Sequence, residues 1–205
     1  MKEIQKLFWR WLQHGYSPYD VFDDFLDVAI ISVINVNRYN PEFEENEKKY
    51  ETIIKKYDWD VEMFSSLLWC FIDKMEHTKD TLKDRIGEYF MLEVSHGEHG
   101  QYFTPDHIAE LCARSTITKE TQEKEFPSYM DCACWSSRML LQAQRIKRGK
   151  SYWIDIDRRC VLMSVFNHVF YGLHGEFTVW NSLMNERKEV FEVKPPFVYH
   201  INFSS

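Results

Sequence analysis

Cysteine and histidine are the side chains of this sequence whose types and spacing could support metal or nucleophilic chemistry. Cys132 and Cys134 are separated by one residue, and Cys112 and Cys160 could complete a set of four thiolates for a zinc ion. The sequence has no Cys-x-x-Cys pair, however, and residues 96–99 (HGEH) lack the His-Glu-x-x-His spacing of zinc peptidases. No local motif supports a cysteine nucleophile. We therefore interpret the cysteines as core residues and predict no metal site.

Acidic and amide side chains follow three short apolar runs in the second half of the sequence. Asp131 ends the run at 129–131, Asp155 ends the run at 152–155, and Asn181 follows a third run. An acid at a strand end commonly caps the next helix.

The elements before residue 95 are predicted to be helices. Apolar residues between Val21 and Val33 follow the 3.6-residue period of an amphipathic helix. Ser17 is predicted to be its N-cap, with Pro18 in the first turn and Asp20 as the capping-box partner. The same reasoning predicts further helices around 7–12 and at 41–56, 58–74 and 81–93. Such a set of helices is typical of a packed bundle.

The elements after residue 95 are predicted to alternate between strands and helices. Residues 97–103 are predicted to form a loop, and Thr104 is predicted to cap a helix that has Pro105 at its first position. The strands are expected at 129–131, 152–155, 177–179 and 197–203, and the later helices at 136–147 and 158–172. This alternation predicts βαβ units and a parallel sheet, and therefore an α/β fold.

Composition and charge exclude several classes of protein. The chain has 205 residues, and its apolar fraction of 44% excludes a disordered protein. Its formal net charge of -7 excludes a protein that binds nucleic acid by bulk charge alone. Residues 1–94 carry 12 basic and 19 acidic groups, whereas residues 95–205 carry 13 of each, which predicts a boundary between two units. The sequence contains no membrane span and no secretory signal, and its five cysteines favour free thiols in the cytoplasm.

Five segments resemble the motifs of one enzyme family. Residues 100–105 (GQYFTP) resemble the GQFFTP motif of N6-adenine DNA methyltransferases, the group that includes the modification subunits of type I restriction-modification systems. Residues 131–140 (DCACWSSRML) are similar to the DPACGSGxxL motif of that family. Residues 154–157 resemble its E-x-D step after the second strand, 167–172 match N-x-x-x-x-G, and 181–183 resemble the segment after the third strand.

The resemblance covers about residues 80–197 and implies a fold, a cofactor and a partner. The implied fold is a helical bundle (1–94) packed on a partial Rossmann-like parallel sheet of the SAM-dependent methyltransferases (95–205), with strand order 3-2-1-4. The implied cofactor is S-adenosylmethionine (SAM), and the implied partner is DNA. By this resemblance, the residues that bind the cofactor are Tyr102, Phe103, Thr104, Pro105, Asp131, Ala133, Asp155 and Asn181. Thr104 and Pro105 would flank its methionine end, Asp131 its amino group, Asp155 its ribose and Asn181 its adenine.

The sequence departs from the family pattern at the cofactor loop and at the catalytic turn. Trp135 and Ser137 replace the two glycines of the loop, and an unsuitable backbone conformation there would cost about 1–2 kcal/mol. An indole at this position would block the ligand or fill its pocket. The candidate for the catalytic N-P-P-Y/F turn is Lys194-Pro195-Pro196-Phe197. Lys194 has only hydrogen-bond donors and cannot accept a bond from the adenine amine. A plain entry turn is the alternative interpretation.

These departures lead to two functional hypotheses. The chain ends at Ser205, where a methyltransferase sheet needs further strands, so its open edge is expected to be covered by the bundle, a partner or a second copy. The first hypothesis is a degenerate relative (a pseudoenzyme) that is inactive alone and acts as an accessory or regulatory protein, or as a binding module for nucleic acid or SAM. The alternative is a split DNA adenine methyltransferase that a partner chain completes by supplying the catalytic turn. The basic run from Arg145 to Lys150 is interpreted as a solvated helix end or a phosphate-contacting patch.

Overall fold

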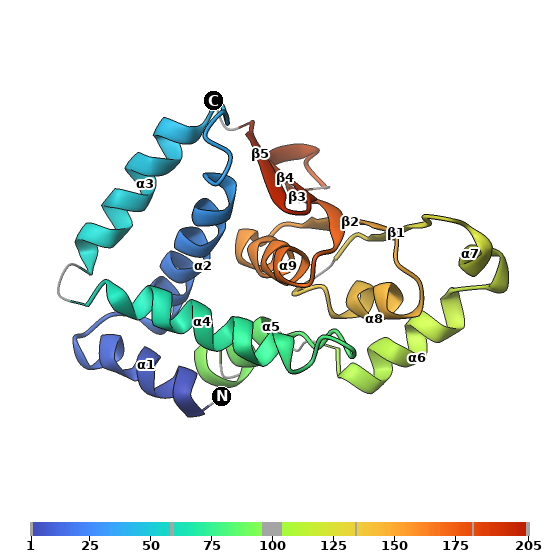
Figure 1. The fold of residues 1–205 in the computed structure, drawn as a ribbon, viewed down its shortest axis with the longest axis horizontal. Coiled ribbons are helices and arrows are strands. Elements are labelled where there is room, and N and C mark those ends of the chain that lie inside the picture. The colour runs from blue at the N-terminus through green and yellow to red at the C-terminus, as the bar shows by residue number, and fades with distance from the viewer. Residues whose placement is uncertain (1, 58–59, 96–103, 134, 182, 204–205) are drawn as a thin grey trace.

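The computed structural model of the protein describes residues 2–57, 60–95, 104–133, 135–181 and 183–203, and within them the fold is α/β (Figure 1). The first helices are α1 (Lys2–Gln13), α2 (Pro18–Ile34), α3 (Phe43–Lys56), α4 (Glu62–Glu76) and α5 (Arg85–Tyr89), which continues as a π-helical turn, η1 (Phe90–Val94). The later helices are α6 (Asp106–Thr116), α7 (Lys119–Glu123), α8 (Arg138–Ile146) and α9 (Arg158–Phe170). The strands are β1 (Ser128–Asp131), β2 (Lys150–Asp155), β3 (His174–Asn181), β4 (Glu186–Lys194) and β5 (Phe197–Asn202).

The predicted helices are found, but the predicted caps are wrong in detail. Ser17 is the N-cap of α2 with Pro18 at its first position, yet its side chain accepts no capping hydrogen bond, so Asp20 completes no capping box. Pro105, and not Thr104, is the N-cap of α6, and no side chain caps that helix. α7, whose N-cap Thr118 accepts a bond from the N–H of Thr121, was not predicted. The loop predicted at 97–103 lies outside the described residues.

The sheet is mixed, and its strand order differs from the predicted order 3-2-1-4. The order is β1-β2-β3-β4-β5, in which β1, β2 and β3 are parallel, and β4 and β5 are antiparallel to their neighbours. The predicted fourth strand (197–203) is β5, which lies beside β4 at one edge of the sheet and not beside β1, and β1 forms the other edge. β4 (ERKEVFEVK) was not predicted because charged side chains occupy its exposed positions and leave only Val190, Phe191 and Val193 buried.

Helix α9 is buried because it lies between the sheet and the helices of the first half of the chain. Residues Cys160 to His168 are all buried, which is typical of a helix that is packed on every side. Toward the sheet, the ring of His168 packs edge-on against Trp153 and Phe177, with centroids 4.7 and 4.9 Å away. Toward the bundle, Phe166 packs against rings of α2 and α4. One apolar core thus runs across residue 94, and the division into units there stays a prediction.

The two faces of the sheet differ in how they are covered. α8 and α9 lie on one face, and in Figure 1 none of the described helices covers the opposite face. Met130, Tyr199 and Ile201 on that opposite face are 64%, 41% and 53% exposed. Antiparallel strands such as β4 and β5 commonly have one exposed face, whereas parallel strands are almost always covered on both, so the unusual feature is the exposed Met130 on β1. None of the described helices is long and apolar enough to cross a membrane.

Candidate functional site

The carboxyl ends of β1, β2 and β3 surround a pocket of 320 Å³. The loop after β1 contributes Cys132, Ala133 and Trp135 to its wall. The other lining residues are Asp155, Ile156 and Asp157 after β2, Cys160 in α9, and Trp180, Asn181 and Leu183 at the end of β3. The pocket lies at these strand ends because parallel strands end at the same edge of the sheet, where open α/β folds bind ligands.

Backbone N–H groups orient the carboxylate of Asp155 in this pocket. Its Oδ2 accepts a hydrogen bond from the N–H of Trp135 at 3.1 Å, and its Oδ1 accepts one from the N–H of Asp157 at 2.9 Å. Burial raises the pKa of Asp155, and these backbone hydrogen bonds act in the opposite direction. On the other wall, Oδ1 of Asn181 accepts a bond from the N–H of Met184 at 3.2 Å, which shapes the loop after β3. The pocket thus presents a fixed carboxylate and a fixed amide.

The loop between β1 and α8 keeps a backbone conformation that glycine adopts easily. Trp135 has φ +50° and Ser137 has φ +76°, both in the left-handed region. These are the positions where the related motif has glycines, so the backbone shape is retained while side chains have been added. The indole of Trp135 is half-buried against the core and also lines the pocket. The backbone carbonyl of Trp135 accepts a hydrogen bond from Oγ of Ser164 at 3.1 Å.

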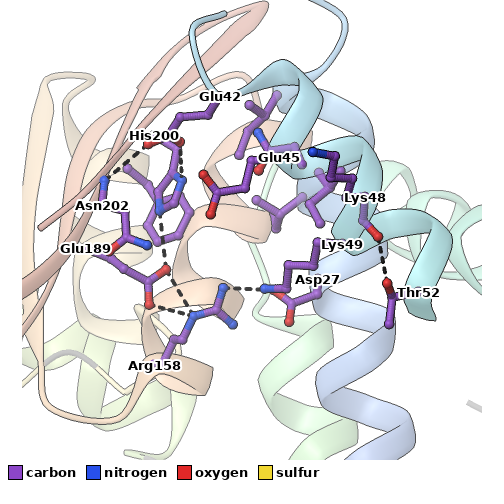
Figure 2. Close-up of a pocket in the computed structure, with 15 residues that line it drawn as sticks. Asp27, Glu42, Glu45, Lys48, Lys49, Thr52, Arg158, Glu189, His200 and Asn202 are labelled. Atoms are coloured by element: carbon purple, nitrogen blue, oxygen red, sulfur yellow. Dashed lines mark hydrogen bonds and ion pairs between the residues drawn. The ribbon is translucent and has the colours of Figure 1, made fainter. Parts of the chain in front are cut away.

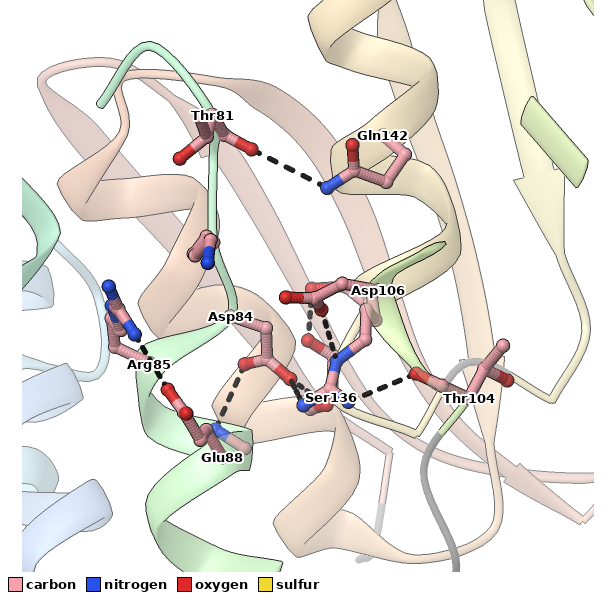
Figure 3. A network of polar contacts seen from close by, with 12 residues as sticks. Thr81, Asp84, Arg85, Glu88, Thr104, Asp106, Ser136 and Gln142 are labelled. Carbon is pink, nitrogen blue, oxygen red and sulfur yellow. Dashed lines mark hydrogen bonds and ion pairs between the residues drawn. The ribbon is translucent and has the colours of Figure 1, made fainter. Parts of the chain in front are cut away.

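A buried polar network fills the space at the start of α8 (Figure 3). Its centre is Asp84, whose side chain is fully buried. Oδ1 of Asp84 accepts bonds from the N–H of Gly87 and from Nδ2 of Asn167, both at 2.9 Å. Oδ2 accepts bonds from Oγ of Ser136 and, at 3.2 Å, from Nη2 of Arg138. The network therefore joins α5, the loop after β1, α8 and α9.

Arg138 extends the network to the start of α6. Its Nη1 donates to the carbonyl of Thr104 at 3.0 Å, and its Nε lies 3.3 Å from Oδ1 of Asp106. Ser136 and Ser137, which precede α8, have no exposed surface. The N-terminal end of α8 is therefore occupied by side chains of the protein itself.

The structure brings together three of the residues that the resemblance assigns to the cofactor and separates the others. Ala133, Asp155 and Asn181 line the pocket. Thr104 lies beside Arg138, next to the exposed Pro105, and neither lines the pocket. Asp131 lines a different hollow together with residues of α6 and α8, and its Oδ1 accepts a bond from the N–H of Ala133 at 3.1 Å. Tyr102 and Phe103 lie outside the described residues.

The segment Lys194-Pro195-Pro196-Phe197 forms the hairpin turn between β4 and β5. Lys194 pairs with Phe197 across this turn. Val193 pairs with Gly175 near the start of β3, whereas the pocket lies at the far end of β3, at Asn181. The turn is therefore at the opposite end of the sheet from the pocket. Its role in catalysis stays a prediction, and in this position it serves as the connection between two antiparallel strands.

A second pocket, of 440 Å³, lies between α2, α3 and the last two strands (Figure 2). Arg158 binds Glu189 at 2.7 Å and Asp27 at 2.8 Å, and His200 lies 2.7 Å from Glu42 and 3.3 Å from Glu189. Burial alone would raise the pKa of Glu189, but the hydrogen bond from His200 and the charge of Arg158 lower it to about 2. The charges of this pocket bind one another, so the cluster holds α2 and α3 against the sheet.

The basic run at the end of α8 is partly neutralised by acidic neighbours. Arg145 lies 3.5 Å from Glu110, and Lys150 lies 3.3 Å from Glu192. Paired cations have little charge left to attract phosphate, which favours the interpretation as a solvated helix end.

The cysteines do not all belong to the core. Cys160 is buried as predicted, but Cys132 is exposed in the loop after β1, so the prediction is wrong for that residue. Cys70 and Cys112 are half-buried, and Cys134 lies outside the described residues. The four described cysteines are free, and no group of three potential metal ligands occurs among the described residues.

Sequence reasoning missed Asp84, the centre of the buried polar network. Aspartate is a preferred N-cap residue, and Asp84 is the N-cap of α5, where its side chain accepts a hydrogen bond from the N–H of Gly87. Its partners Ser136 and Asn167 are 52 and 83 residues away in the sequence, so no local pattern points to them.

Comparison with known proteins identifies the family. The model of the N-6 DNA methylase family matches residues 77–182. No curated protein and no solved structure matches the chain. The matched range contains Asp84 and its network, the loop after β1, and the pocket residues up to Asn181. Since this range covers more than half of the 205 residues, the chain belongs to the N-6 DNA methylase family.

Proposed function

We propose that this chain is a methyltransferase-like protein that transfers no methyl group to DNA by itself and acts as an accessory or regulatory subunit. The observation that carries the proposal is the closed N-terminal end of α8, where Asp84, Ser136 and Arg138 occupy the space beside the cofactor loop. In this family SAM donates the methyl group, and its methionine part would need Thr104, Pro105 and Asp131 to face one site. Among the described residues, the carbonyl of Thr104 binds Arg138, and Asp131 lines a different hollow from Asp155, which supports the proposal.

The position of the Pro-Pro turn supports the same proposal. A catalytic turn must present hydrogen-bond acceptors to the adenine amine next to the transferable methyl group. Lys194 offers only donors, and its Nζ already binds Glu192 at 2.7 Å. The turn also lies at the opposite end of β3 from the pocket. None of the described residues that line the pocket forms an equivalent catalytic turn.

The alternative, a split enzyme completed by a partner chain, is favoured by the uncovered side of the sheet. Among the described strands, β1 is an edge strand whose neighbour is β2, and its Met130 is 64% exposed. A free strand edge can pair with another chain. A partner or a second copy would bind there, whereas direct DNA binding is the weaker proposal because Arg145 and Lys150 of the basic run are paired with acids.

The main proposal is tested by measuring transfer of tritiated methyl groups from SAM to adenine-containing duplex DNA. We expect incorporation by the purified chain to equal that of a reaction without protein, while an active N6-adenine methyltransferase in the same buffer labels the DNA. Incorporation above background that disappears in the Asp155→Asn variant would refute the proposal.

The split-enzyme alternative needs a second measurement. Candidate partner chains that carry an N-P-P-Y/F turn would be added in equal amounts, and the assay repeated. Transfer that requires both chains, and that is lost when Met130→Glu disrupts the exposed sheet face, would establish the alternative. The matched control is Lys55→Glu, which introduces the same residue at a side chain of α3 that is 76% exposed and lies outside the sheet.

A further inference from the structure

The outer edge of β1 borders a hollow of 460 Å³ that residues of α6, α7 and α8 complete. All four residues of the strand, 128–131, line this hollow. Successive side chains of a strand point to opposite faces of the sheet, so a hollow that contacts all four residues must run along the edge of the strand. The hollow therefore lies where a further strand would pair, beside β1 and on the side away from β2.

The main-chain groups of β1 that face this hollow are those of Ser128 and Met130. The carbonyl of Pro127 accepts a hydrogen bond from the N–H of Lys150 at 2.9 Å, which fixes the register between β1 and β2. Alternate residues of a parallel strand bond to the same neighbour, so Tyr129 directs its main-chain groups toward β2, and Ser128 and Met130 direct theirs outward. No other described residue bonds to these outward groups.

The two edges of the described sheet differ in how they are engaged. At the edge formed by β5, the N–H of Asn202 donates to Oε1 of Glu42 at 3.4 Å, and the ring of His200 lies 2.7 Å from the same carboxylate. Natural edge strands avoid pairing through lysine, proline, bulges or a covering element. β1 (SYMD) contains neither lysine nor proline, and it keeps one regular register with β2. Of the two edges, β1 is therefore the one open to another strand.

The floor of the hollow determines which side chains an added strand would bury. Four apolar residues of α6, its C-cap and α8 form this floor, and each is less than 10% exposed: Ala113, Ile117, Leu140 and Ala143. Every second residue of the added strand would contact the floor, so these residues should be apolar. The residues between them would face the same side as Met130, which is 64% exposed, and should be polar.

The charge around β1 determines the kind of partner. Residues 119–131 contain two lysines and four acids, which are Glu120, Glu123, Glu125 and Asp131. None of these acids forms an ion pair with another described residue. A second copy would bring the same acidic segment to the edge, and the net charge of -7 on each chain adds to the repulsion. A strand flanked by lysine or arginine would be attracted instead.

We infer that the edge of β1 binds an extended segment of a partner chain as an added β-strand, with apolar residues at alternate positions and basic residues at both ends. The inference rests on the proposed function, because an accessory subunit needs a surface that holds its partner. It deepens that function by naming the surface and its chemistry. Ser128 and Met130 supply the main-chain hydrogen bonds, the floor of the hollow buries the apolar residues, and the acids of 119–131 attract the basic ends.

The test is isothermal titration of the whole chain with the synthetic peptide acetyl-Lys-Lys-Val-Thr-Val-Thr-Val-Lys-Lys-amide. We expect binding below millimolar concentration, and binding at least about tenfold weaker for a control of the same composition in which the valines are consecutive. No binding of the first peptide at millimolar concentration, or equal binding of the control, would overturn the inference.

Two N-methylated peptides show whether the main chain of the peptide pairs with the edge. One carries N-methyl groups on its valines and the other on its threonines, so each lacks the N–H groups along one edge of the extended peptide. Only one of these edges can face β1. We expect one of the two peptides to bind at least about tenfold more weakly than the other, and the weaker one reports the strand direction. Equal binding would overturn pairing through the main chain.

Variants of Met130 test the strand edge itself. Met130→Pro removes the outward N–H, and Met130→Thr is the matched control because it removes the same side chain and keeps the N–H. With both variants folded by circular dichroism, we expect Met130→Pro to bind the peptide at least about tenfold more weakly, and equal binding would overturn the inference. If Met130→Pro does not fold, hydrogen exchange of the unsubstituted chain decides: the peptide should slow exchange at the Met130 amide at least about tenfold, and unchanged exchange would overturn the inference.

The outcomes also distinguish this inference from the proposed function. A chain that transfers no methyl group and binds no peptide would overturn the inference alone. Methyl transfer by an isolated chain that binds the peptide would overturn the proposed function alone. A dimer of the chain that Met130→Pro dissociates in sedimentation would overturn the choice of a basic partner over a second copy.

Discussion

Replacing Asp84 by alanine should be among the most destabilising single substitutions in this protein. Its side chain is fully buried and accepts hydrogen bonds from Gly87, Ser136, Arg138 and Asn167. Asp84→Ala would leave the guanidinium of Arg138, which is only 12% exposed, without its buried counter-charge. Removing one partner of a buried ion pair costs about 3–5 kcal/mol.

Asp106 provides a matched control, because its carboxylate contacts the same guanidinium. The Asp106 side chain is 46% exposed, and its Oδ1 lies 3.3 Å from Nε of Arg138. An exposed pair of this kind contributes about 0–1 kcal/mol, so Asp106→Ala should cost little. Each variant therefore removes one of the two carboxylates that contact Arg138, and the two carboxylates differ mainly in how deeply they are buried.

The assay is equilibrium unfolding in urea, followed by tryptophan fluorescence and circular dichroism. We expect the midpoint of Asp84→Ala to fall well below that of Asp106→Ala at an unchanged slope. The double variant Asp84→Asn/Arg138→Gln should cost less than the sum of Asp84→Ala and Arg138→Ala, because it leaves no unpaired buried charge. Equal costs for Asp84→Ala and Asp106→Ala, within about 0.5 kcal/mol, would refute the reasoning.

Three further predictions concern the same region of the fold. Gly87→Ala should lower the unfolding free energy by about 1–3 kcal/mol, because the added Cβ would lie 2.6 Å from Cβ of Ser136; urea midpoints measure this, and an unchanged midpoint contradicts it. Ser137→Gly should raise the unfolding free energy by about 0.5–1 kcal/mol, since φ +76° is strained for serine; a loss of stability would show that its side chain matters more than its backbone. Burial lowers the pKa of His168 from 6.5 to about 3, so between these values the unfolded chain binds a proton that the folded chain does not. Stability should therefore be complete above the unfolded value and decline by about 2 kcal/mol on going to pH about 5, and His168→Gln should flatten that decline in urea titrations.

Much of the fold followed from local patterns in the sequence. The 3.6-residue period of α2 and the short apolar runs of β1, β2 and β3 are properties of neighbouring residues, and these elements were predicted near their observed bounds. Asp155 and Asn181, which follow β2 and β3 and line the pocket, were singled out by the resemblance to the methyltransferase motifs. Parallel strands with similar connections bring such strand ends to one edge of a sheet.

Other features required the tertiary structure. β4 carries so many charged residues that its strand period was hidden, and its place beside β3 overturned the predicted strand order. Trp135 has φ +50°, a left-handed conformation that its residue type does not favour, and only the tertiary structure shows that the loop adopts it. The residue type indicates which backbone conformation is preferred locally, whereas the surrounding contacts determine which conformation the residue adopts.

The sequence by itself determined the helices other than α7, four of the five described strands, and the order of the motifs that connect the chain to N-6 DNA methylases. Only the tertiary structure decided that Asp84 is buried and bonded to Ser136 and Arg138 at the start of α8, and that Asp155 and Asn181 line one pocket. The physical reason is the separation along the sequence of the residues that interact. Periodicity and caps act over a few residues, whereas burial and charge pairing depend on groups that are 52 or more residues apart in the sequence.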